Sequence, residues 1–156
     1  SKGFYRLYPG NKVRLKYGHI IECTGANKDA NGQVTEVLAQ LIPDTKSGTP
    51  GSDSVKVKGV ITWVSQADAI KAEVRLYDRL FTEANPDAGG KDFLASLNPD
   101  SLKVIEAYVE PSLANSKPDE KFQFERHGYF VADRADHQGT TPVFNRSTGL
   151  KDTWSK

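Results

Sequence analysis

Short segments rich in β-branched and aromatic residues run through the chain, and each is ended by a cluster of Gly, Pro, Asn or Asp. This spacing is typical of a barrel or sandwich of antiparallel strands, because each short strand must turn back along its neighbour. Helix is expected only as a minority element. The sequence therefore predicts an all-β fold with a few short helical turns.

Nine segments carry the strand pattern. We predict strands over residues 12–16, 19–24, 33–42, 55–64, 71–80, 102–110, 121–125, 129–132 and 143–146. The run from Asn27 to Gly32 supplies residues that tolerate the positive φ of a hairpin turn, so the second and third strands should pair antiparallel. Short helical turns are predicted over 65–69, after a serine cap, and over 92–97.

One long connection, residues 43–54, differs from the rest in composition. It holds two prolines, two glycines and no large apolar side chain. Such a segment buries too little apolar surface to offset the entropy cost of ordering it. We predict a mobile loop here.

The composition and the absence of long apolar runs indicate in which compartment the protein is expected. A chain of 156 residues buries a core without disulfides, and its single cysteine, Cys23, has no internal partner, as in a reducing cytoplasm. No apolar run approaches the ~20 residues of a membrane span, and no signal peptide opens the chain. We predict a cytoplasmic protein without membrane contact. Methionine is absent even at position 1, which predicts a piece of a longer reading frame.

Residue types that carry catalysis are scattered rather than clustered. Cys23 has no activating partner in the sequence, and His19, His127 and His137 lack the spacing of metal ligands. The run 89–91, Gly-Gly-Lys, lacks the flanking residues of a phosphate loop. The sequence therefore predicts neither catalytic residues nor a metal site.

Positive charge gathers near the start of the chain although the net charge is only +1. The first sixteen residues contain no acid and five basic residues: Lys2, Arg6, Lys12, Arg14 and Lys16. A strand over 12–16 places the last three on one face, about 6.6 Å apart, which is comparable to successive phosphates of a single strand. One interpretation of this pattern is a contact to the RNA backbone or to a base edge. A solvated basic edge that resists aggregation remains the alternative.

A second group lies in the run Phe-Gln-Phe-Glu-Arg at 122–126. Alternation turns both phenylalanines toward the core and displays Gln123 and Glu125 outward beside Arg126. These planar groups donate and accept the hydrogen bonds that read the edges of splayed-out bases. The alternative is a structural Glu125–Arg126 pair.

The two tryptophans, Trp63 and Trp154, offer stacking surfaces for bases. Trp63 lies in the apolar run Val-Ile-Thr-Trp-Val at 60–64, which favours a place in the core instead. We therefore predict that Trp63 is buried.

Four segments in order resemble one known family. The segments 56–65, 73–81, 122–130 and 142–154, among them Lys-Gly-Val-Ile-Thr-Trp-Val-Ser and Phe-Gln-Phe-Glu-Arg, resemble the C-terminal anticodon-binding region of bacterial-type glutaminyl-tRNA synthetases of class I. The resemblance implies two linked antiparallel β-barrels of the ribosomal-protein-like anticodon-binding fold. It implies an incomplete proximal barrel from residues 1–16 and 121–156, with residues 17–120 forming the distal barrel.

The resemblance also implies a function and its residues. The barrels are expected to clasp the anticodon loop of glutamine tRNA. Gln123 and Arg126 match residues that contact one anticodon base in this family, and the basic strand around Arg14 and Lys16 matches residues that contact another. Lys151 is expected to contact the RNA backbone, and Lys12 and Glu125, from the same two segments, complete the predicted RNA-binding set. Lys16 stands where the family commonly has arginine, so an ammonium replaces a group capable of bidentate contact.

Catalysis is expected elsewhere in the parent protein. The class I active-site signatures are missing from this sequence. Ligation of glutamine with ATP and Mg²⁺ is therefore assigned to a catalytic domain of the same polypeptide, which we expect to be a monomer. Two alternatives stay open, namely the barrels of an archaeal or eukaryotic glutamyl-tRNA synthetase and a stand-alone RNA-binding β-barrel.

Overall fold

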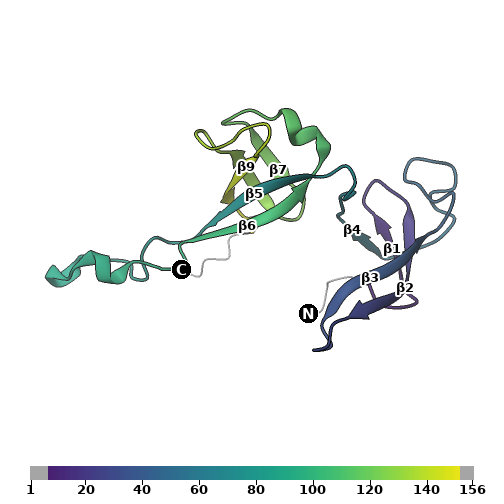
Figure 1. The fold of residues 1–156 in the computed structure, drawn as a ribbon, viewed down its shortest axis with the longest axis horizontal. Helices are drawn as coiled ribbons and strands as arrows, with labels where there is room; N and C mark the ends of the chain where they lie inside the picture. Colours follow the sequence, from purple (N-terminus) through teal and green to yellow (C-terminus); the bar gives the residue numbers. More distant parts are fainter. Residues whose placement is uncertain (1–6, 152–156) are drawn as a thin grey trace. The chain divides into compact units, whose positions relative to one another are not determined.

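The computed structural model of the chain describes residues 7–151, so the expectations for Lys2, Arg6 and Trp154 lie outside the described residues. The chain divides into two compact units at the Trp63–Val64 bond, as Figure 1 shows. Strands dominate both units, and helix is limited to short 3₁₀ turns. The all-β prediction is confirmed. None of the helices in the described residues is long and apolar enough to cross a membrane.

The first unit holds a four-stranded sheet in the order β3-β2-β1-β4. Its strands are β1 (Lys12–Leu15), β2 (Ile20–Lys28), β3 (Val34–Leu41) and β4 (Gly59–Ile61). Alternation along β1 buries Val13, which lies with the buried Ile20 and Cys23 of β2 in the core of this unit.

The predicted hairpin between β2 and β3 is confirmed. The two strands pair antiparallel from Ile21 with Leu41 to Lys28 with Val34. Asp29 Oδ1 accepts hydrogen bonds from the backbone N–H groups of Asn31 and Gln33, and Gly32 adopts a φ of +78°. An Asx turn followed by glycine thus reverses the chain here.

The second unit holds a five-stranded sheet in the order β6-β5-β9-β8-β7. Its strands are β5 (Ile70–Tyr77), β6 (Leu102–Val109), β7 (Lys121–Phe124), β8 (Gly128–Ala132) and β9 (Val143–Thr148). The buried cluster consists of Ala72, Val74, Val109, Phe130, Ala132 and Phe144. The connection between β5 and β6 extends away from the sheet (Figure 1).

Two details of the sheets differ from expectation. The described strands form open sheets rather than closed barrels, and each sheet contains one parallel pair. β1 runs parallel to β4, and β5 runs parallel to β9, because a long connection separates the partners in each case. Sequence alternation predicted the strands but carried no information about which non-neighbouring strands would pair.

The pairing also groups the chain differently from the nested division 1–16 and 121–156 against 17–120. β1 is hydrogen-bonded to β2 and β4 within the first unit, and β7 to β9 share one sheet with β5 and β6. The strands therefore form units over residues 1–63 and 64–156. How these units correspond to a proximal and a distal barrel stays a prediction.

Short helical turns were predicted at two places. The turn over 92–97 is confirmed as a 3₁₀ helix, Phe93–Ser96, whose N-cap Asp92 accepts a hydrogen bond from the N–H of Leu94. Residues 65–69 form only a turn, closed by a 2.7 Å hydrogen bond from Ala69 N to Ser65 O. Two further 3₁₀ turns, Ala88–Gly90 and Pro111–Asn115, were not predicted.

Candidate nucleic-acid interface

The turn between β1 and β2, residues 15–19, displays part of the basic sequence. Leu15 N donates to His19 O at 2.9 Å, and Gly18 N donates to Leu15 O at 2.8 Å. Tyr17 takes a left-handed φ of 61°, and its side chain is exposed. This turn therefore holds Lys16 and Tyr17 in a defined backbone conformation.

Arg14 does not lie on a solvated face as the alternation predicted. Its Nη1 donates to the backbone oxygens of Gly18 at 3.1 Å and Thr45 at 2.6 Å, and its Nη2 donates to Ser52 O at 2.5 Å. Ser47 Oγ lies 3.4 Å from Nη1. The guanidinium thus joins the β1–β2 turn to the segment that follows β3. Alternation along the strand correctly predicted that Arg14 lies on the face opposite Val13, but not that the segment 43–54 covers its guanidinium.

The segment 43–54 is fastened by polar contacts, which contradicts the basis for predicting a mobile loop. Thr45 is fully buried, and its Oγ1 accepts from Ile20 N at 2.9 Å and donates to Ile42 O at 2.7 Å. Ser47 N donates to Gly18 O at 3.0 Å. The prediction considered only apolar side chains that could hold the loop in place, whereas hydrogen bonds hold it.

The other two residues of the basic strand lie at the surface. Lys12 Nζ is 3.4 Å from Glu22 Oε2, its cross-strand neighbour on β2. Lys16 is half-buried, and its Nζ lies 5.3 Å from the centre of the Tyr17 ring. The Lys12 ammonium is thus ion-paired with a carboxylate at the surface, and the Lys16 ammonium lies beside an aromatic ring.

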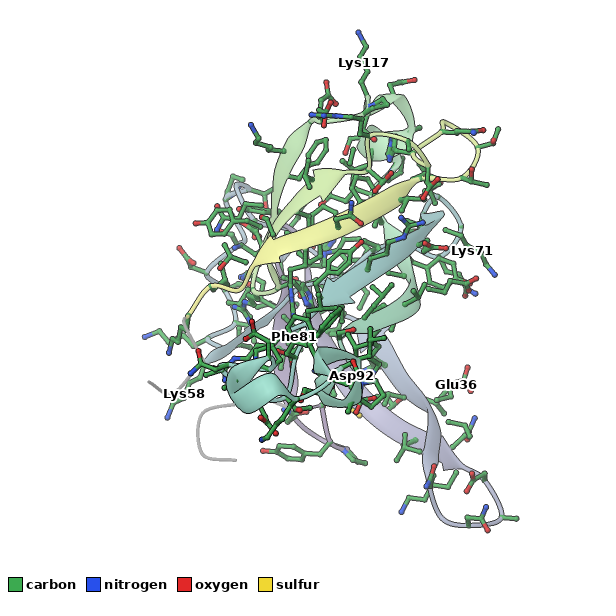
Figure 2. The ribbon with its side chains drawn as sticks, turned by 90° about the vertical axis from the view of Figure 1, so that its left-hand side faces the viewer. Glu36, Lys58, Lys71, Phe81, Asp92 and Lys117 are labelled. Carbon is green, nitrogen blue, oxygen red and sulfur yellow. The ribbon has the colours of Figure 1, made fainter. Side chains whose placement is uncertain are left out.

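Two further lysines join this basic surface, and sequence reasoning missed them. β1 and β4 pair in parallel with Val13 opposite Gly59, so Lys58 enters β4 beside Lys12. A hollow of about 340 Å³ lies here, lined by Tyr8, Gly10, Asn11, Lys12, Val13, Lys56, Val57, Lys58 and Gly59. Figure 2 shows the Lys58 side chain projecting from the surface. The alternation of Lys56 and Lys58 was visible in the sequence, but the parallel pairing was not.

The second unit presents the other predicted group on the β7–β8 hairpin. Phe122 and Phe124 are half-buried and pack on the core, with ring centroids 5.7 Å and 5.3 Å from Phe144. The intervening Gln123 is exposed. The predicted division between inward phenylalanines and an outward glutamine is confirmed.

Glu125 and Arg126 occupy the turn that closes this hairpin. His127 N donates to Phe124 O at 2.9 Å, and Arg126 adopts a φ of 67° at the third position, as in a type II turn. Both side chains are exposed. Gln123, Glu125 and Arg126 are thus displayed within four consecutive residues at one end of the sheet.

A glycine fixes how closely this hairpin approaches β9. Gly128 has a φ of +135°, and a Cβ atom there would lie 2.5 Å from Thr148 O. Thr148 ends β9, and the exposed Lys151 follows three residues later. Lys151 therefore leaves the sheet at the end that carries Arg126. The structure brings the three residues 123, 125 and 126 together with this end of β9, while the basic strand lies in the other unit.

Charged groups elsewhere in the second unit are bound to one another. Arg75 contacts Glu73 at 2.7 Å, Asp136 at 2.7 Å and Asp133 at 3.5 Å. The hydrogen bonds that the guanidinium donates to Glu73 and, to a lesser degree, to Asp136 raise the pKa of Arg75. The N–H of Asp136 and the Asn145 side chain lower the pKa of Asp133 from 3.8 to about 2. This network keeps fixed charges at neutral pH and ties β5 to the loop before β9.

Residues suited to metal or acid–base chemistry are dispersed in the described chain. No group of three or more His, Cys, Asp or Glu side chains over residues 7–151 is arranged to hold a metal ion. His137 is buried, its Nδ1 meets the backbone N and O of Val143 at 3.1 Å and 3.0 Å, and its Nε2 lies 3.1 Å from Ser116 O. It serves as a structural histidine of the core.

Comparison with known families gives the class of protein. Two family models match the chain, and both are described as tRNA synthetases class I (E and Q), anti-codon binding domain. One matches residues 60–133 and the other residues 1–42. These matches show that the chain belongs to the anticodon-binding domains of class I tRNA synthetases. The all-β fold is consistent with this family.

Individual relatives are similar along nearly the whole chain. The glutamine–tRNA ligase of Ralstonia nicotianae is 67% identical over 155 residues, covering 99% of this chain and 27% of that protein. The glutamine–tRNA ligase of Cupriavidus necator is 68% identical over 155 residues, again 99% of this chain and 26% of that protein. That of Bordetella avium is 57% identical over 154 residues, 99% and 26% respectively. The chain thus spans about a quarter of the length of these relatives.

Proposed function

We propose that this chain recognises the anticodon loop of glutamine tRNA as the C-terminal part of a glutamine–tRNA ligase. The observation that carries the proposal is the β7–β8 hairpin, whose core-facing Phe122 and Phe124 fix the outward Gln123 and Arg126. An amide and a guanidinium held in place on a rigid strand and its turn are suited to the edges of unpaired bases. Glu125 adds an acceptor beside them, and Lys151 adds a charge for the RNA backbone.

The first unit contributes the second contact surface in this proposal. Lys12 and Lys16 meet phosphates or a base edge, and Lys56 and Lys58 extend the positive surface. Arg14 contributes to this surface indirectly, because both its Nη atoms already donate to backbone oxygens of Gly18, Thr45 and Ser52. Its guanidinium holds the turn that presents Lys16.

The rest of the activity is assigned to the parent polypeptide. A catalytic domain would bind ATP with Mg²⁺ and ligate glutamine to the tRNA, in the cytoplasm and in a monomeric enzyme. This chain would select the tRNA and supply no group to the chemical step.

The rival partner is glutamate tRNA, because the matching family description covers both E and Q. Titrating the chain with labelled anticodon stem-loops of glutamine tRNA and of glutamate tRNA distinguishes the two. We expect tighter binding to the glutamine stem-loop, and weakening of both complexes as salt rises. Equal affinity for the two stem-loops would count against anticodon recognition by this chain, and preference for glutamate would favour the rival.

A further inference from the structure

The indole of Trp63 is not in the core, contrary to the sequence prediction. Its side chain is 47% exposed, although it lies only two residues after the end of β4. Its Nε1 donates to Lys16 O at 3.0 Å, so the polar edge of the ring is satisfied by the protein. The part of the indole left to solvent is therefore largely its apolar surface.

A second exposed aromatic side chain belongs to the β1–β2 turn, which the indole contacts through Lys16 O and Gly18. Tyr17 is 73% exposed and takes a φ of 61°, a conformation that bulky residues rarely adopt. The ammonium of Lys16 lies 5.3 Å from the centre of its ring. The turn thus presents an aromatic ring and a positive charge together.

The two rings belong to one fixed substructure. Lys16 N donates to Ile61 O at 2.8 Å, which ties the turn to β4 two residues before Trp63. The indole also packs over Gly18, where an added Cβ would lie 3.5 Å from Trp63 Cζ2 and 3.3 Å from Leu15 Cβ. The glycine therefore lets the indole approach the turn closely.

We propose that Trp63, beside the turn that carries the exposed Tyr17, stacks against one unpaired base of the bound RNA while Lys16 contacts the adjoining phosphate. The inference rests on the proposed function and deepens it by naming the group that receives a splayed-out base in the first unit. A base has a flat apolar face bordered by negative charge, which matches exposed rings bordered by lysine. Lys12, Lys56 and Lys58, at the other end of the parallel β1–β4 pair in the same unit, favour RNA over an apolar protein segment as the partner.

The chain contains two tryptophans, so Trp154→Phe leaves Trp63 as the only indole and as an internal reporter. This variant is titrated with the anticodon stem-loop of glutamine tRNA and with a fully paired RNA duplex of equal length. We expect the stem-loop to quench Trp63 emission with the same midpoint that labelled RNA gives by anisotropy. The duplex should quench far less, because its bases are already stacked on one another.

Affinity measurements on ring variants complete the test. Trp63→Ala should weaken stem-loop binding about tenfold to a hundredfold, the range for loss of one stacked base, and Trp63→Phe should retain most of the affinity. Tyr108→Ala is the matched control, since Tyr108 is 43% exposed and has a lysine, Lys71, 5.8 Å from its ring centre in the other unit. It should bind RNA as the parent chain does.

The outcomes separate this inference from the proposed function. RNA binding with unchanged Trp63 emission, together with normal affinity in folded Trp63→Ala and Trp63→Phe, would overturn the stacking role and leave anticodon recognition standing. Absence of any RNA binding would overturn both. A change of Trp63 emission with protein concentration alone, without RNA, would assign the exposed rings to self-association and also overturn the stacking role.

Discussion

Arg14 and Thr45 are joined by a 2.6 Å hydrogen bond from Nη1 to a backbone oxygen, across 31 residues of sequence. The bond connects a side chain of β1 to a threonine that is itself completely buried. A basic residue that belongs by sequence to a charged strand therefore acts as an internal clamp. Its contribution to RNA binding is through the position of the β1–β2 turn.

Replacing Arg14 should destabilise the first unit. Arg14→Lys keeps the charge but cannot reach Thr45 O and Ser52 O together as the guanidinium fork does. We expect a loss of about 2–3 kcal/mol in the free energy of unfolding, as for hydrogen bonds with a charged donor. Urea unfolding and amide exchange over 43–54 measure it.

Lys12→Ala is the control for Arg14→Lys, because Lys12 contacts Glu22 only at the surface and should change stability little. RNA affinity should fall in both variants, but only the Arg14 variant should speed exchange of the amides near Thr45. Unchanged stability and exchange in Arg14→Lys would contradict the clamp.

β1 to β3 of the first unit were predictable, whereas its site was not, and the strand predicted over 55–64 is formed only by Gly59–Ile61. Alternation at residues 12–16 and the Asn-Gly turn chemistry before Gln33 are local signals, and both elements formed where predicted. The clamp on Thr45 and the position of Lys58 beside Lys12 depend on chain segments that meet only in the folded sheet. For the same reason Trp63 was misplaced, since its apolar neighbours indicated burial and nothing local revealed the exposed face.

Lys56 and Lys58 should contribute to RNA binding without regard to base sequence. Each flexible ammonium attracts a phosphate, so replacement by alanine should lower the slope of log K against log salt by roughly 0.7 per lost contact. The measurement is a salt titration with stem-loops of different loop sequence. Lys71→Ala serves as control, because Lys71 is an exposed lysine of the other unit with its Nζ 3.1 Å from Glu106. Equal slopes in all variants would remove these lysines from the interface.

Asp133 should make the stability of the second unit depend on acid pH. Its pKa is lowered from 3.8 to about 2 in the fold, so its carboxylate stabilises the folded state above pH 3.8, and this contribution disappears as pH falls toward 2. In the parent chain Asn145 Nδ2 donates to Asp133 Oδ2 at 2.6 Å. In Asp133→Asn the same group would face an uncharged amide instead of a carboxylate. We expect a loss of about 1–3 kcal/mol at neutral pH.

The difference between Asp133→Asn and the parent chain should shrink in urea unfolding experiments as pH is lowered from 3.8 to 2. Asp136→Asn is the comparison, since Asp136 also contacts Arg75 but is 55% exposed, and its effect should be smaller. A difference that stays constant over this pH interval would show that the carboxylate charge of Asp133 is not what stabilises the network.

The hairpin of the second unit was the better predicted of the two surfaces because its signal is local. Phe122, Gln123 and Phe124 alternate along a strand that packs one face on a core, so the outward position of Gln123 follows from the sequence alone. The left-handed conformation of Arg126 and the close passage of Gly128 by Thr148 do not follow from it. The first belongs to the turn that closes the β7–β8 hairpin, and the second depends on how β8 pairs with β9.

Gln123 and Arg126 provide the test that separates base reading from phosphate attraction. Alanine at either position should reduce kcat/KM for glutamine tRNA about tenfold to a hundredfold in a ligase that carries this chain, because each lost base contact is worth about 1–3 kcal/mol. Binding of glutamine and ATP should be unaffected. With tRNAs altered at single anticodon positions, each variant should lose selectivity at one position, whereas Lys12→Ala should weaken the binding of all these tRNAs alike.

Folding of the hairpin in the variants is checked by near-ultraviolet circular dichroism, since Phe122 and Phe124 of this hairpin pack against the core. Variants of Gln123 and Arg126 that discriminate among anticodons as the parent does would show that these side chains do not read bases.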